Sequence, residues 1–240
     1  MGINNRGYDS NVQTSSGVKL LRQIAVPYAR CPSDAAADRT DWSISNYSGS
    51  MGSQRVDSSN ASCNPYSTQQ VLGVGNYEDL GPGGNCNNGD CGDPTPQRNI
   101  SGIFSYRGPD LMSFASILDG TSNVIMIGEV LPSCVIDSFT FGSDQCAIGS
   151  TVCPINIMAP CDPTTNVALS KNHAYSACTQ AADLNTVRNL AWAFKSLHPQ
   201  GAQFVYADGS VHFLMQQMNY ATYQRLGGRR DGLALDSINP

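Results

Sequence analysis

The chain has 240 residues, a length that suits a single domain spanning 1–240 and carrying sizeable loops. Only 14% of its residues are charged, and the composition is rich in Ser, Gly and Asn, which favour turns over long helices. The net charge of −5 argues against a basic surface that contacts the phosphates of a nucleic acid, so nucleic acid is not expected as a partner. No run of 18 apolar residues occurs, and no membrane contact is expected from this chain.

The first 31 residues predict little regular structure. Residues 1–15 are polar and are expected to be poorly ordered. Apolar residues at helical spacing predict a short helix over 16–24. Because Pro27 stops this helix, residues 26–31 are predicted to be extended.

Two loop-rich insertions are predicted in the middle of the chain, over 51–100 and 132–180. Short strands are expected around 42–47 and 70–77, and a short helix over 113–118. Together the two insertions hold all the cysteines except Cys31, so they are too rich in cysteine to be plain flexible linkers.

The C-terminal part carries the strongest local signals. A continuous apolar run predicts a buried strand over 124–130. Alternating residues over 202–207 and 210–214, joined by Asp-Gly, predict a β-hairpin with a type I′ turn. A register that pairs residue 206 with residue 211 would place the side chains of Phe204, Tyr206, Val211 and Phe213 on one face of the hairpin. A short helix is predicted over 218–226, closed by Gly227-Gly228.

The cysteines predict disulfides and an oxidising compartment. No pair has the Cys-x-x-Cys spacing of zinc knuckles or thioredoxins, and the gaps are wide and irregular. Cys86 and Cys91 form the tightest candidate pair. The odd count leaves at least one thiol that is free or pairs outside the chain, and reduced buried thiols remain the alternative reading. The nine positions are 31, 63, 86, 91, 134, 146, 153, 161 and 178.

An exported protein needs a targeting segment, and the polar start Met1-Gly-Ile-Asn-Asn-Arg6 does not resemble a signal peptide. We therefore expect that Met1 is not the natural start and that an N-terminal part precedes it.

Four short motifs carry a resemblance to a known family. Nine residues separate His198 from Asp208-Gly209, a spacing similar to the C-terminal signature of the prepilin-type processing-associated proteins. Three further stretches resemble that family in order and distance: Arg30-Cys-Pro-Ser-Asp34, Ser45-Asn-Tyr-Ser-Gly-Ser50, and Leu118-Asp-Gly-Thr-Ser-Asn123 with Gly128-Glu129 after it. The motif residues are Cys31, Asp34, Asn46, Asp119, Gly120, Asn123, Glu129, His198, Asp208 and Gly209.

The resemblance implies an architecture and a location more than an activity. It implies an α+β fold, a pilin-like globular head with an antiparallel β-sheet, short helices and long disulfide-stapled loops. Members of the family open with a type IV pilin-like leader and a hydrophobic helix, and we expect these segments to be missing here and to precede Met1 in the natural protein. It further implies an extracellular or cell-surface location, in a system similar to type IV pili or type II secretion.

Catalytic and metal chemistry find little support in the sequence. No Gly-x-Ser-x-Gly motif occurs, and His198 is expected to be structural, so no catalytic residue is assigned and the chain is not expected to be an enzyme. Asp119 and Glu129 do not by themselves make an acid–base pair. No cofactor is expected, although calcium remains a candidate. Its ligands would be Asn85, Asn87, Asp90 and Asp93.

The leading functional hypothesis is a structural subunit of an extracellular filament, pseudopilus or cell-surface layer, with copies of itself or related pilin-like subunits as partners. The alternative is a cell-surface module that binds a solute or polysaccharide, with Trp42 or Trp192 contacting a surface glycan. A hydrolase is the third and weakest class.

Overall fold

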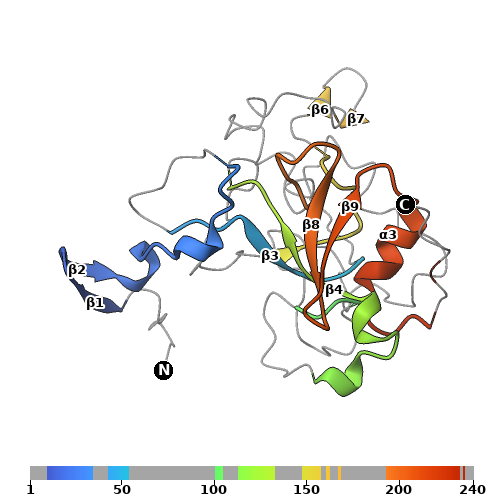
Figure 1. Ribbon diagram of the computed structural model, residues 1–240, viewed down its shortest axis with the longest axis horizontal. Coiled ribbons are helices and arrows are strands. Elements are labelled where there is room, and N and C mark those ends of the chain that lie inside the picture. The colour runs from blue at the N-terminus through green and yellow to red at the C-terminus, as the bar shows by residue number, and fades with distance from the viewer. Residues whose placement is uncertain are drawn as a thin grey trace, which may run out of the picture.

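The computed structural model describes residues 10–34, 43–53, 101–104, 113–132, 148–157, 161–162, 167–168, 193–232 and 235. At its centre lies a five-stranded sheet in the order β5-β3-β4-β8-β9 (Figure 1). All neighbouring strands are antiparallel except β3 and β5, which are parallel, so the sheet is mixed. The strands span Tyr47–Ser50 (β3), Ile125–Glu129 (β4), Ile148–Gly149 (β5), Gly201–Tyr206 (β8) and Val211–Met215 (β9).

One helix completes the core. Helix α3 spans Tyr220–Gly227, two residues later than its predicted start, because the side chain of Asn219 caps it by accepting a hydrogen bond from the Thr222 amide. Its Tyr223 packs against Phe204 of β8 with ring centroids 6.1 Å apart. The buried cluster comprises Ile125, Val130, Ile155, Phe194, Ala202, Phe204, Tyr206, Leu214, Tyr223 and Leu226. The predicted mixture of helix and strand is therefore confirmed.

The predicted helix over 16–24 is wrong. Residues Asn11–Thr14 (β1) and Gly17–Leu20 (β2) form a hairpin, and only Leu21–Gln23 (η2) is helical, as a 3-10 turn. Three apolar residues do not offset the cost of nucleating so short a helix. The hairpin also includes residues 11–14, within the segment expected to be poorly ordered, and it lies to one side of the central sheet (Figure 1).

Several other predicted elements differ in type or bounds. The segment predicted to be extended over 26–31 contains the 3-10 helix Pro27–Ala29 (η3), since proline suits the first helical position. The strand expected around 42–47 begins at Tyr47 instead. The helix expected over 113–118 is the 3-10 turn Phe114–Ser116 (η6), followed by Thr121–Asn123 (η7). The buried strand over 124–130 is confirmed as β4.

The hairpin β8–β9 forms as predicted, but its turn and register differ. Only Gly209 of the Asp-Gly pair has a positive φ, of +86°, whereas a type I′ turn needs two such residues. The Gly209 amide donates to the Tyr206 carbonyl at 2.9 Å, and the loop therefore has three residues. Val205 consequently pairs with Val211, and Phe204 with His212. Phe204 and Tyr206 are buried, whereas Val211 and Phe213 lie on the opposite, exposed face.

We expect Gly209→Ala to lower the free energy of unfolding by about 1 kcal/mol, because a Cβ disfavours this backbone conformation. A Cβ at this position would meet no atom within 4 Å, so backbone strain is the whole cost. Urea denaturation measures the change. Gly209→Asn is the control, because asparagine tolerates positive φ and should cost less; an equal loss in both variants would contradict the strain argument.

Disulfide staples are not found at the cysteines whose thiols the structure describes. Neither the Cys31 thiol nor the Cys153 thiol forms a disulfide. Cys153 is fully buried, and burial raises the pKa of its thiol to about 12. The candidate pair Cys86–Cys91, the predicted strand over 70–77, and the calcium candidates Asn85, Asn87, Asp90 and Asp93 lie outside the described residues.

A small two-stranded sheet lies within the second predicted insertion, formed by Cys161–Asp162 (β6) and Val167–Ala168 (β7). In the described ranges, no helix has both the length and the apolar character needed to span a bilayer.

Candidate functional site

The ten motif residues gather at the two ends of β4. At the Glu129 end the structure brings together Cys31, Asp34, Asn46, Glu129 and His198. Around the Ile125 end lie Asp119, Gly120, Asn123, Asp208 and Gly209. Segments far apart in the sequence therefore meet because β4 is central in the sheet.

The cluster at the Ile125 end ties turns together. The Asp208 amide donates to the Thr121 carbonyl at 3.1 Å, which joins the hairpin loop to η7. The carboxylate of Asp119 accepts the amides of Asp231 (2.7 Å) and Gly232 (2.9 Å), and so anchors the chain after α3. Main-chain amides satisfy this carboxylate, which gives Asp119 a structural role.

The carboxylate of Asp208 accepts its hydrogen bonds from within its own loop. Its Oδ1 accepts hydrogen bonds from the Ser210 hydroxyl (2.6 Å) and amide (2.8 Å), which hold the pKa of the carboxyl below its ordinary value. Gly120, with a φ of +89°, precedes η7, and the side-chain amide of Asn123 donates to the Asp119 carbonyl. Hydrogen bonds within and between the turns therefore account for the motif residues at this end of β4.

The other end holds three groups of different chemistry, here named the Cys–Glu–His cluster: Cys31, Glu129 and His198. The Sγ of Cys31 lies 4.0 Å from Nε2 of His198, and Oε1 of Glu129 lies 3.4 Å from the same nitrogen. One ligand atom from each residue lies within 4.8 Å of the other two. A thiol, a carboxylate and an imidazole therefore face a common point.

Glu129 is held rigidly by the sheet. It ends β4, and its side chain is only 5% exposed. Its Oε2 accepts the Gln203 amide at 2.8 Å, and its carbonyl accepts the Lys195 amide at 2.8 Å. The Gln203 amide therefore satisfies Oε2 of this buried carboxylate, and the other oxygen, Oε1, faces His198.

Cys31 is positioned by the buried side chain of Asn46. The Oδ1 of Asn46 accepts the amide of Cys31 at 3.0 Å and Nε of Arg30 at 3.1 Å. Its Nδ2 donates to Oδ2 of Asp34 at 2.5 Å and to the Val130 carbonyl at 3.3 Å. One side chain thus joins the Cys-Pro-Ser-Asp turn to the end of β4.

His198 is held through its backbone and keeps an accessible ring. Its amide donates to Oγ of Ser196 at 3.1 Å, and the Ser196 amide donates to Oδ1 of Asn156 at 2.8 Å. The His198 side chain is 33% exposed, so the cluster opens to solvent on this side.

Tyr47 lies beside the cluster and was missed as a site residue. It pairs with Glu129 across β3 and β4, and burial, followed by the charges of Cys31 and Glu129, raises the pKa of its phenol. The signal was its place after Asn46 in the Ser-Asn-Tyr motif.

The geometry separates two kinds of chemistry. In a cysteine–histidine nucleophile pair, the thiol contacts one ring nitrogen and the orienting group holds the other. Here Cys31 and Glu129 both approach Nε2 of His198. Three donor atoms around one point are instead the arrangement of metal ligands.

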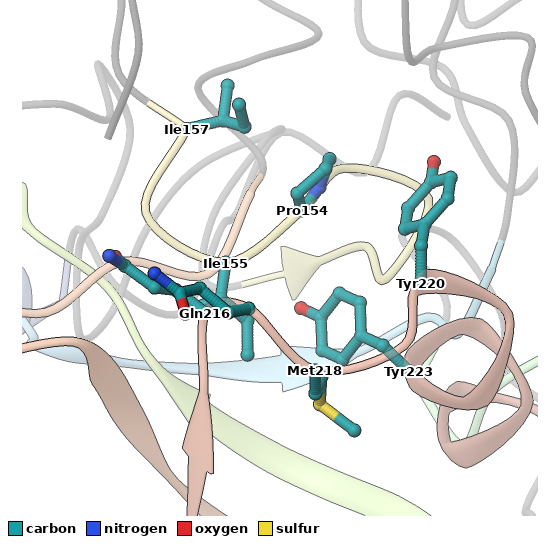
Figure 2. A pocket seen from close by; sticks show the side chains of 8 residues that line it. Pro154, Ile155, Ile157, Gln216, Met218, Tyr220 and Tyr223 are labelled. Atoms are coloured by element: carbon teal, nitrogen blue, oxygen red, sulfur yellow. The ribbon is translucent and has the colours of Figure 1, made fainter. Parts of the chain in front are cut away.

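A pocket of about 270 Å³ lies beside α3 (Figure 2), and no motif residue lines it. The buried hydroxyl of Tyr223 points toward the side where Ile155 and Gln216 lie, and it has no hydrogen-bond partner in the part of the chain that the structure describes. Burial raises the pKa of this phenol well above its ordinary value. The walls are formed by Pro154, Ile155, Ile157, Gln216, Gln217, Met218, Tyr220 and Tyr223. Sequence reasoning did not find this pocket, because its residues follow no motif.

Comparison with known proteins gives one match. No curated protein and no solved structure matches the chain. The model of a family described as "Protein of unknown function (DUF1559)" matches residues 4–220, which cover most of the sequence and all ten motif residues. The chain belongs to this DUF1559 family.

Proposed function

We propose that the protein is a structural subunit of an extracellular filament, pseudopilus or cell-surface layer, assembling with copies of itself or related subunits. The four ordered motifs support this proposal through their resemblance to the prepilin-type processing-associated proteins, whose heads are pilin-like. The proposal places the protein outside the cell or at its surface and gives it no catalytic role.

The observation that carries the proposal is an apolar edge, defined as the exposed face of β9 formed by Val211, Phe213 and Met215. These side chains are 61%, 42% and 41% exposed, and their odd-numbered spacing places them on one face. Strand β9 also stands at the end of the described sheet. Contiguous exposed apolar side chains on an edge strand favour association with another chain.

We expect the variant Val211→Thr/Phe213→Thr/Met215→Thr to lose assembly while keeping its fold, because threonine suits a strand but removes the apolar surface. Sedimentation velocity over a range of concentrations and electron microscopy measure the assembly, and circular dichroism measures the fold. Wild-type protein should form higher species that the variant does not form.

Val18→Thr is the matched control, because Val18 lies on β2 and is also 61% exposed. It should assemble like the wild type. A wild-type protein that stays monomeric at every concentration, or a triple variant that assembles normally, would count against the apolar edge as the contact.

The pocket supports a second candidate, a cell-surface module that binds a solute or polysaccharide. A concave site of this size, with apolar walls and glutamine amides, suits a small polar organic ligand, and among the described residues the Tyr223 hydroxyl has no hydrogen-bond partner. A glycan and solute screen on wild-type protein and on Met218→Trp, which would fill the pocket, tests it. Trp42 and Trp192, the sequence-based candidates, lie outside the described residues.

A further inference from the structure

We propose that Cys31, Glu129 and His198 form a binding site for one divalent transition-metal ion, with Zn²⁺ as the best-matched ion. This proposal is independent of the proposed assembly, because the apolar edge contributes no residue to the site.

The spacing of the donor atoms suits such an ion. Zinc binds cysteine sulfur at about 2.3 Å and histidine nitrogen or carboxylate oxygen at about 2.0–2.2 Å, in tetrahedral geometry. These bond lengths separate neighbouring ligand atoms by roughly 3–4 Å. The observed separations are 4.0 Å from Sγ to Nε2 and 3.4 Å from Oε1 to Nε2, and small side-chain rotations would complete the coordination.

The chemistry of the three donors selects the metal class. Calcium and magnesium prefer all-oxygen ligands, whereas a thiolate, an imidazole and a carboxylate together suit zinc and its neighbours in the first transition row. A divalent ion would also balance the charge of the buried Glu129 carboxylate and of the Cys31 thiolate. His198 is the ion-pair partner of Glu129 among the described residues, and it is charged only when protonated.

The supporting contacts hold each donor in place without metal. Asn46 fixes the amide of Cys31, the Gln203 amide holds Oε2 of Glu129, and Ser196 holds the amide of His198. Ligands oriented by such neighbours bind metal more tightly. Three protein ligands leave one tetrahedral position open, and the exposed side of His198 gives it access to water or to a ligand from outside.

Cobalt titration of the reduced, metal-free protein tests the site, because Co²⁺ replaces Zn²⁺ and reports its own ligands. We expect one Co²⁺ per chain, visible bands of a tetrahedral ion, a thiolate-to-cobalt charge-transfer band, and displacement by one equivalent of Zn²⁺. Cys31→Ser should remove the charge-transfer band, and His198→Gln and Glu129→Gln should each weaken Zn²⁺ binding at least tenfold.

The chain supplies matched controls. Cys153→Ala removes the other thiol that the structure describes, and His212→Gln removes an exposed imidazole; both variants should bind Co²⁺ and Zn²⁺ like the wild type. Circular dichroism verifies that every variant is folded. The near-isosteric Cys31→Ser decides the test if Glu129→Gln does not fold. Absence of the charge-transfer band in wild-type protein, or its persistence in Cys31→Ser, would overturn the proposal.

Discussion

Replacing Asn46 by Asp lowers the free energy of unfolding by about 4 kcal/mol, the largest effect that we expect from any single substitution near the Cys–Glu–His cluster. The change keeps the size of the side chain but converts a donor into an acceptor. It removes the hydrogen bonds from Nδ2 to Asp34 and Val130, and places a second carboxylate 2.5 Å from that of Asp34. Because Asn46 is buried, water does not compensate for either loss.

Urea denaturation measures this prediction, with the midpoint expected to fall and the slope to stay unchanged. Asn123→Asp is the control, because Asn123 is exposed and its side chain donates a hydrogen bond to the Asp119 carbonyl. The control should change stability by no more than about 1 kcal/mol. Similar losses in the two variants would show that the network around Asn46 is not especially stabilising.

Elements with a strong local pattern were predictable. The apolar run of β4, the alternation of β8 and β9 and the glycines at the end of α3 each specify their element over a few neighbouring residues. The register of the β8–β9 hairpin was not predictable from the Asp-Gly pair alone. The same dipeptide fits a two-residue loop and a three-residue loop, and the two differ by one residue in pairing.

The failure at residues 16–24 has a similar cause. Val18, Leu21 and Ile24 fit helical spacing, but only three such residues are available, and Gly17 takes a φ of +112° at the start of β2. A short amphipathic pattern is therefore a weak predictor where a glycine allows a tight turn.

The motif residues were found in the sequence, but their convergence was not. Cys31, Glu129 and His198 are separated by dozens of residues, and only the antiparallel pairing of β4 with β3 and β8 brings their segments together. One signal was available: Glu129 is one of only two glutamates, and it lies at the end of a buried strand. Spacing along the chain could not reveal that its carboxylate is turned toward His198.

Lys195 is the residue whose environment sequence reasoning could least foresee. It is fully buried, its Nζ donates to the Ala193 carbonyl at 3.0 Å, and it lies close enough to Cys153 for the two groups to affect each other's titration. Burial lowers its pKa from 10.5 to about 7, and the nearby Cys153 only partly opposes this shift. At low pH the folded protein must keep this buried lysine charged, which lowers the stability of the folded state.

We therefore expect stability to rise by about 2 kcal/mol between pH 7 and pH 9 on account of Lys195. In this range the unfolded chain keeps the proton that the folded protein has released, so raising the pH favours folding; Cys153, with its raised pKa, opposes the trend above pH 9. Urea denaturation at pH 6, 7, 8 and 9 measures the slope.

Lys195→Met should remove most of this slope and gain stability relative to the wild type as the pH falls. Lys19→Met, at an exposed position of β2, is the matched control and should keep the wild-type slope. Parallel curves for wild-type protein and Lys195→Met would mean that Lys195 does not lose its proton near neutral pH.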